Sequence, residues 1–270
     1  MSGTEQRGQL LAEAFREEYG LDDVPLKDMH ALVHAALGVD VLSMKASESE
    51  HGLSMRDPVT GRVVIAVATT PHPMRHRSSI AHEIGHVVAG DLDRDVPLVP
   101  GERSHEEKRA DAFARHLLLP LEAIRRRFPA AKRPSLTDLS DLVQEFEVSP
   151  MIASIQLRTL DLIDAGTCRS WGARSASNLA ITFGWGSQYH VLAADSSTPR
   201  APQSLMARAV VGYQRGVLGL NELAGWYGRR RAELEEELGV PEPADVDSWS
   251  DEWDDDAPLF TSDTREGLAS

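Results

Sequence analysis

One short stretch of the sequence has the residue types and spacing of a metal site. His82, Glu83 and His86 lie within "SSIAHEIGHVVAGD", residues 78–91. On a helix, side chains four positions apart lie one turn apart on nearly the same face, so both imidazoles can point at one ion. Glu83 is turned by about 100° from His82 and can approach a water beside that ion without being a ligand. This HExxH spacing is typical of zinc metallopeptidases.

The motif also has a simpler interpretation, as a helix with a solvated polar face. Chance gives roughly 0.03–0.06 such matches in a chain with ten histidines and 42 acidic residues. However, Ile84, Val87 and Val88 indicate a largely buried helix, on which imidazoles and a carboxylate need partners. Gly85 costs a helix about 1 kcal/mol relative to alanine, and it lets another element approach closely. We therefore favour the zinc site.

A zinc site on this helix needs a third protein ligand, with water in the fourth position. The next predicted helix offers Glu106 and Glu107, both near the margin of its apolar stripe. Periodicity does not choose between them, and both also suit the acidic first turn of a helix. Glu102 and His105 are weaker candidates. Asp111 lies one turn after Glu107 and could accept a hydrogen bond from a ligand histidine.

The remaining sequence predicts a mixture of helices and strands. Three segments read as strands, and the turn sequence "DPVTG" between the last two indicates a hairpin, so we expect a small antiparallel meander. In the motif helix, Ser78 or Ser79 could be the N-cap and Gly90 the end. The predicted strands are 39–44, 51–57 and 61–69, with a further β-hairpin over 178–194 that turns at 184–186. The other predicted helices are 4–19, 26–37, 104–118, two within 135–164, 204–217 and 220–238.

Composition and charge exclude several classes of protein. The chain has 270 residues and a net charge of −14, and residues 241–270 hold ten acidic residues and one basic residue. Non-specific nucleic-acid binding needs an excess of lysine and arginine, so we expect no direct nucleic-acid contact. No apolar run reaches the 18 residues of a membrane span. The single cysteine, Cys168, and an N-terminus unlike a signal peptide favour the cytoplasm.

Residues 136–163 resemble a helix-turn-helix pair. A DNA-binding role is disfavoured, because this segment carries five acidic residues and one basic residue, Arg158. The simpler interpretation is a helical pair that packs on the core or docks a substrate. The acidic tail is expected to be disordered, and its tryptophans leave open a docking motif or a DNA mimic.

Two stretches together resemble the ImmA/IrrE family of bacterial and phage metallopeptidases. They are "RHRSSIAHEIGH" (75–86) and "EKRADAFARHLLLP" (107–120). The family often has an aromatic residue where Ser78 stands and threonine where Ser79 stands, and the likeness weakens beyond residue 165. In this resemblance Glu107 occupies the position of the third ligand, so one Zn²⁺ ion would be held by His82, His86 and Glu107.

The resemblance implies an α+β fold with a minimal zincin-like domain, built of a small antiparallel sheet and helices that include the HExxH helix. We expect this domain over 1–130, a helix-turn-helix-like pair over 131–165, a β-hairpin and helices over 166–240, and the acidic tail over 241–270.

The resemblance also implies a function. Glu83 would be the general base of a zinc endopeptidase that cleaves a helix-turn-helix repressor and so derepresses stress or mobile-element genes. The alternative is a non-proteolytic anti-repressor that sequesters the same partner. Arg75, Arg77, His105 and His116 are further candidates to stabilise an oxyanion.

Overall fold

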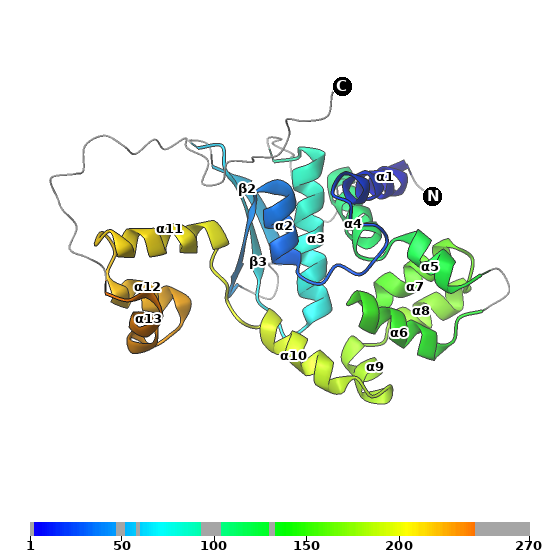
Figure 1. Cartoon of the computed structure of the whole chain (residues 1–270). Coiled ribbons are helices and arrows are strands. Elements are labelled where there is room, and N and C mark those ends of the chain that lie inside the picture. Colours follow the sequence, from blue (N-terminus) through cyan, green and yellow to red (C-terminus); the bar gives the residue numbers. More distant parts are fainter. Residues whose placement is uncertain (1–2, 47–51, 58–59, 93–103, 130–132, 241–270) are drawn as a thin grey trace, which may run out of the picture. The chain divides into compact units, whose positions relative to one another are not determined.

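The computed structural model describes residues 3–46, 52–57, 60–92, 104–129 and 133–240 (Figure 1). It divides into two compact units, of which the first is Met1–Met206 and the second begins at Ala207. The expected finer division at residues 130 and 165 stays a prediction. The acidic tail, 241–270, lies outside the described residues.

A small mixed sheet forms one layer of the first unit. Its strands are β1 (Asp40–Met44), β2 (Gly52–Arg56) and β3 (Val63–Ala68), in the order β1-β3-β2. The β2–β3 pair is antiparallel, with Ser54 opposite Ile65, as the predicted hairpin requires. β1 instead runs parallel to β3, with Val41 opposite Ile65, so the antiparallel meander was wrong. β3 has the most apolar sequence, and the central position buries its Ile65 and Val67.

The helix that carries the HExxH motif is α3 (Pro73–Ala89). It ends at Gly90 as predicted, because the left-handed φ of 69° lets the glycine N–H bond back to the last turn. Ser78 and Ser79 lie inside the helix and are not its caps. Proline presets φ at the first helical position and has no N–H to satisfy there, so the helix begins at Pro73, well before the predicted start.

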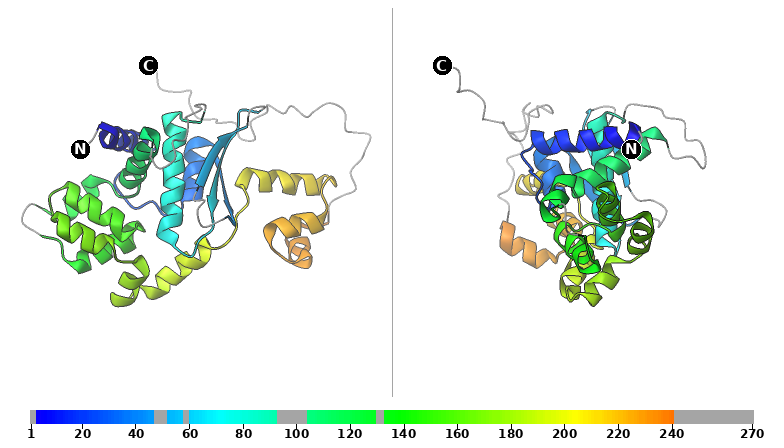
Figure 2. Two further views of the ribbon diagram at one scale, coloured as in Figure 1. Left: turned by 180° about the vertical axis from the view of Figure 1, so that it is seen from behind. Right: turned by 90° about the vertical axis from the view of Figure 1, so that its right-hand side faces the viewer.

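α3 lies between the sheet and a second pair of helices. On the sheet side, α3 and α2 (Met29–Leu37) cover one face (Figures 1 and 2). α2 begins later than the predicted residue 26 because Asp28 caps it. On the other side, α1 (Gly3–Glu18) and α4 (His105–Leu118) pack on each other and on α3. The core between these layers includes the fully buried Ile84, Phe113 and Leu117.

A group of short helices completes the first unit. They are α5 (Leu121–Arg127), α6 (Leu136–Phe146), α7 (Pro150–Thr159), α8 (Ala165–Gly172), α9 (Ala176–Thr182) and α10 (Gly186–Ser196). The predicted pair within 135–164 is confirmed as α6 and α7. At the turn between them Glu147 has a φ of 52°, and its carboxylate pairs with Arg77 of α3 at 3.2 Å and with Lys27 at 3.1 Å. This turn is therefore fastened to the motif helix.

The β-hairpin predicted over 178–194 was wrong, because this segment forms α9 and α10. Ser175 caps the first of these helices. Gly184, with a φ of 85°, separates them. The apolar residues Trp185, Tyr189 and Leu192 recur at helical spacing and pack on the core. The apolar pattern that suggested a strand therefore has a helical period of about 3.6 residues.

The second unit is helical in its described part. It takes in most of α11 (Gln203–Gln214), then α12 (Leu220–Tyr227) and α13 (Arg231–Leu238). One helix was predicted over 220–238, but Gly228 adopts a left-handed φ of 62° and ends α12. The hydroxyl of Tyr213 donates to the carbonyl of Gly239 at 2.8 Å and ties the end of α13 to α11.

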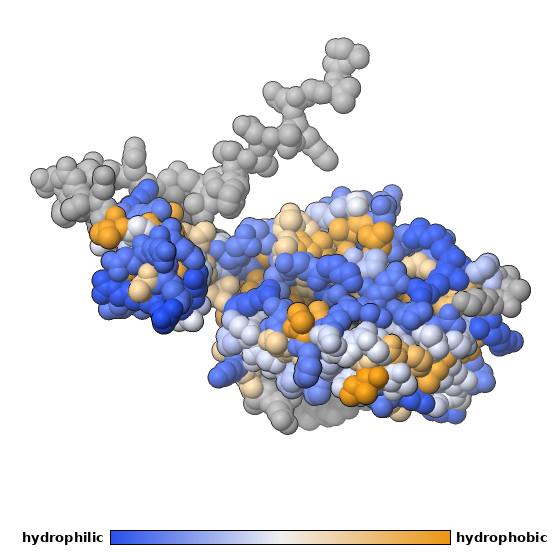
Figure 3. All heavy atoms as spheres, turned by 60° about the horizontal axis from the view of Figure 1, so that its bottom comes forward, coloured by the Kyte–Doolittle hydropathy of each residue, from blue (hydrophilic) through white to orange (hydrophobic). Residues whose placement is uncertain are grey.

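The surface shows no single dominant apolar region in the view of Figure 3, where hydrophobic residues lie in separate groups among polar ones. Within the described residues, none of the helices has the length and apolar character needed to cross a membrane.

The crossing of α1 over α4 gives a test of the fold. A Cβ added at Gly8 would lie 2.5 Å from both the Ala112 Cβ and the Arg109 carbonyl oxygen, whereas one at Gly3 would meet nothing within 4 Å. Gly8→Ala should therefore lower the free energy of unfolding by about 1–3 kcal/mol, despite the better helix propensity of alanine. Gly3→Ala, on the same helix, is the control. Urea unfolding measures both, and equal stabilities would contradict this crossing.

Candidate metal centre

α3 and α4 bring two imidazoles and one carboxylate to a single point. The Nε2 atoms of His82 and His86 lie 3.1 Å apart. Glu107 places one carboxylate oxygen 3.3 Å from each of these nitrogens. These three side chains offer one ligand atom each, all within 4.8 Å of one another, and they are half-buried. In the described part of the chain this is the only such group of histidine, cysteine and acidic side chains.

Two local features of the sequence bring Glu107 to the histidines. Ser104 caps α4 and its hydroxyl accepts from the Glu107 N–H at 3.2 Å, which fixes the first turn. Gly85 faces α4 closely, since a Cβ there would lie 3.1 Å from the Phe113 ring and 3.2 Å from the Ala110 Cα. Gly85 therefore permits the close approach of another element that its position in the motif predicted, and that element is α4.

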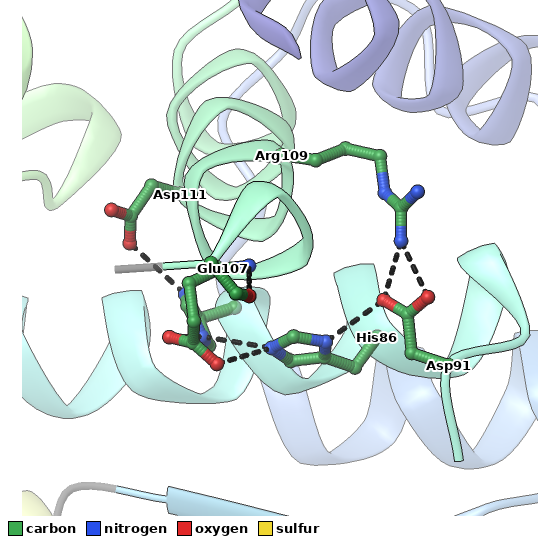
Figure 4. Close-up of polar contacts among 7 residues, drawn as sticks. His86, Asp91, Glu107, Arg109 and Asp111 are labelled. Carbon is green, nitrogen blue, oxygen red and sulfur yellow. Dashed lines mark hydrogen bonds and ion pairs between the residues drawn. The ribbon is translucent and has the colours of Figure 1, made fainter. Parts of the chain in front are cut away.

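The outer nitrogen of each imidazole faces a carboxylate. His82 Nδ1 lies 3.1 Å from Asp111 of α4, and His86 Nδ1 lies 3.0 Å from Asp91, just after α3 (Figure 4). A carboxylate only accepts hydrogen bonds, so we assign the proton of each neutral imidazole to Nδ1. Both Nε2 lone pairs then point toward the carboxylate of Glu107.

Two imidazole nitrogens and a carboxylate oxygen that converge on one point favour a positive charge between them. The pKa values of these side chains also favour a positive charge at this point. Burial disfavours the charged imidazole of His82, but the hydrogen bonds to Asp111 and Glu107 outweigh it and raise its pKa to about 9. The hydrogen bonds to His82 and His86 hold the pKa of Glu107 well below its usual range. A divalent metal ion would supply this positive charge, as bound protons also do.

The donor set fits zinc in type and spacing. Ligand atoms at zinc distances of about 2.0–2.2 Å lie about 3.3–3.6 Å apart in a tetrahedron. The separations among the His82, His86 and Glu107 ligand atoms, 3.1–3.3 Å, are close to this spacing. Two imidazoles and one carboxylate form a set used by catalytic zinc sites, in which the fourth position remains for water.

Glu83, the fourth residue of interest, lies between α3 and the sheet. Its side chain is buried and packs against Gly52 at the start of β2. A Cβ at Gly52 would lie 2.7 Å from Glu83 Oε1 and 3.0 Å from its Cγ. The absence of a side chain at Gly52 therefore leaves the space that the Glu83 carboxylate occupies.

The structure distinguishes among the candidate third ligands that periodicity left open. Glu107, and not Glu106, reaches the imidazoles. His105 Nδ1 lies 3.4 Å from the hydroxyl of Thr4, and Glu102 lies outside the described residues. Asp111 takes the expected place beside His82.

Other polar residues have roles that the sequence did not indicate. Arg77 pairs with Glu147, and His116 binds Glu5 and Gln156, so both side chains are engaged within the fold. Asp91 was missed, although its position five residues after His86, directly after the helix-ending glycine, could have signalled a side chain folded back on the motif.

The comparisons with known proteins concern this same part of the chain. Residues 35–158 match the family model of peptidase family M78, the IrrE N-terminal-like domain. No match was found among curated proteins. The matched segment includes the sheet, α3 and α4, and hence every side chain of the candidate centre.

Metal binding provides a direct test of the candidate centre. The protein loaded with zinc should hold one ion per chain, whereas His86→Ala and Glu107→Ala should each remove a ligand and abolish tight binding. Glu83→Gln should bind zinc as tightly as the wild type, because Glu83 is not among the side chains that offer ligand atoms to this group. Metal content after dialysis and competition with a chelator measure these affinities. Full zinc retention in Glu107→Ala would contradict the proposed ligand set.

Proposed function

Because the chain belongs, through residues 35–158, to the ImmA/IrrE family of metallopeptidases, we propose that it is a zinc-dependent endopeptidase. The observation that carries this proposal is the convergence of His82, His86 and Glu107 on one point. Glu83 lies on the same helix as the two histidines, one residue after the first of them.

The chemistry follows from the type of each group. When bound, zinc supplies a Lewis acid that makes water a better nucleophile and polarises a peptide carbonyl. Glu83 accepts the proton of the attacking water on its carboxylate and returns it to the nitrogen of the leaving amine. The side chains of Asp111 and Asp91 hold the imidazoles in the tautomer that keeps both Nε2 lone pairs available.

The position of β2 supports a polypeptide substrate. β2 is an edge strand of the described sheet, and Gly52 at its start touches the Glu83 side chain. An edge strand presents backbone N–H and carbonyl groups to which an extended peptide can add as a further strand. Leu53 and Met55 of this strand are exposed and offer apolar contacts to such a segment.

We further propose, from the family resemblance, that the substrate is a helix-turn-helix repressor, whose cleavage derepresses stress or mobile-element genes. The chain's own helical pair, α6 and α7, is a poor candidate for DNA reading, since its acidic residues outnumber its basic ones. The turn of this pair also uses Glu147 to bind Arg77. The excess of acidic residues on this pair favours a protein partner over DNA.

Cleavage of a repressor distinguishes an enzyme from a sequestering protein. Zinc-loaded protein incubated with a helix-turn-helix repressor encoded nearby should give one defined cut, and Glu83→Gln should give none while it still binds zinc. Gel electrophoresis and mass spectrometry identify the cut. If Glu83→Gln relieves repression as well as the wild type does and the repressor stays intact, the protein acts by sequestration and the peptidase proposal fails.

Gly52 allows the general base to be disturbed without touching the ligands. Gly52→Ala should displace the Glu83 carboxylate and lower kcat by about 100-fold, since a misplacement of about 1 Å has effects of this size. Its zinc affinity should equal that of the wild type. Gly225→Ala in α12, where a Cβ meets nothing within 4 Å, is the matched control. An unchanged kcat in Gly52→Ala would show that Glu83 is not held by this contact.

A further inference from the structure

We propose that Asp91 and Arg109 form a positioning pair for the metal ligand His86, through which α4 controls the orientation of an imidazole on α3. The inference rests on the proposed metal centre and assigns roles to two residues that are not themselves ligands. It follows from the placement of the side chains in Figure 4.

Asp91 is held in place by its own backbone and by burial. It directly follows Gly90, and its N–H bonds to the carbonyl of His86 at 3.1 Å. Its carboxylate turns back, so that Oδ2 lies 3.0 Å from His86 Nδ1. The side chain is only 7% exposed. A carboxylate removed from water in this way needs charged or hydrogen-bonding partners, and here it has both.

Arg109 supplies the charged partner from the other helix. One of its terminal nitrogens lies 2.5 Å from each oxygen of Asp91, and the guanidinium is 16% exposed. Because Arg109 engages both oxygens, the Asp91 carboxylate cannot rotate away without the loss of a charge-assisted contact. The oxygen that faces His86 therefore stays aligned with Nδ1 and keeps the proton there. His86 Nε2 remains directed at Glu107.

The two histidines are consequently positioned in different ways. His82 is bound directly by Asp111 of α4, whose side chain is 33% exposed. His86 is bound by the more buried Asp91, which in turn depends on Arg109. α4 thus supplies the third ligand Glu107 and also fixes both imidazoles. The metal geometry is set across the α3–α4 contact and not within α3 alone.

A matched ion pair on α4 separates a positioning role from a purely structural one. Arg115 binds Glu5 of α1 at 2.5 Å and is 14% exposed, so it resembles Arg109 in its helix, its exposure and its short ion pair, but its partner does not contact a metal ligand. Asp91→Ala and Arg109→Met should weaken zinc binding by about 10–100-fold, whereas Arg115→Met should leave it unchanged. Arg109→Lys, which keeps the charge, should recover part of the affinity.

The zinc affinity is measured by competition with a chelator on the full chain, and urea unfolding measures the stability of every variant. The visible absorption spectrum of the cobalt-substituted protein reports ligand geometry independently of activity. It should change in Asp91→Ala and Arg109→Met and stay constant in Arg115→Met. If Asp91→Ala or Arg109→Met does not fold, Asp91→Asn and Arg109→Gln serve for the same comparison.

Three outcomes are distinguishable. Weaker zinc binding and an altered cobalt spectrum in the Asp91 and Arg109 variants, with Arg115→Met unchanged, would support the pair as a positioning device. Folded Asp91 and Arg109 variants with wild-type affinity and spectrum would overturn it, as would an equal loss in Arg115→Met. A wild-type protein that holds no zinc would instead overturn the proposed function itself.

Discussion

The close contact between α3 and α4 is the constraint on which the candidate centre depends. Gly85 lets the two helices approach until the Phe113 ring and the Ala110 backbone fill the space that a side chain would need. Only at this separation does the Glu107 carboxylate reach both imidazoles at 3.3 Å. The helix propensity lost at one glycine is therefore offset by the packing of Phe113 and by the geometry of the site. α1 packs on the other side of α4, where Gly8 approaches α4 even more closely.

The charged groups at this contact favour a positive charge at the centre. Glu107, Asp91 and Asp111 lie around His82 and His86, with Arg109 directed at Asp91. The hydrogen bonds of His82 raise its pKa despite burial, because these acids favour any cation at that position. An ion with two charges satisfies the same groups while leaving both imidazoles neutral.

Local signals in the sequence predicted the parts of the structure that local interactions determine. The HExxH helix, its end at Gly90, the helix of Glu107 and the break between α6 and α7 follow from periodicity and capping alone. The choice of Glu107 over Glu106 needed the family resemblance, since both flank the same apolar stripe. The parallel direction of β1 could not be predicted, because it depends on which strand takes the central position with a neighbour on each edge, and this is decided by tertiary packing. The segment around Trp185 and Tyr189 was predicted wrongly, since an aromatic-rich segment with two glycines fits the patterns of both a hairpin and a helix pair. The pairing of Asp91 with Arg109 could not be predicted, because it arises only when α4 packs on α3.

The ligands of the candidate centre come from two helices separated by a long connection, and this has a thermodynamic consequence. An ion held by His82, His86 and Glu107 acts as a cross-link between α3 and α4, which unfolding must break. Since the unfolded chain does not gather these three side chains, the ion stabilises only the folded state, by an amount that grows with its free concentration. The supply of such an ion would then set the stability of the folded protein as well as its chemistry, and scarcity of the ion would weaken both together.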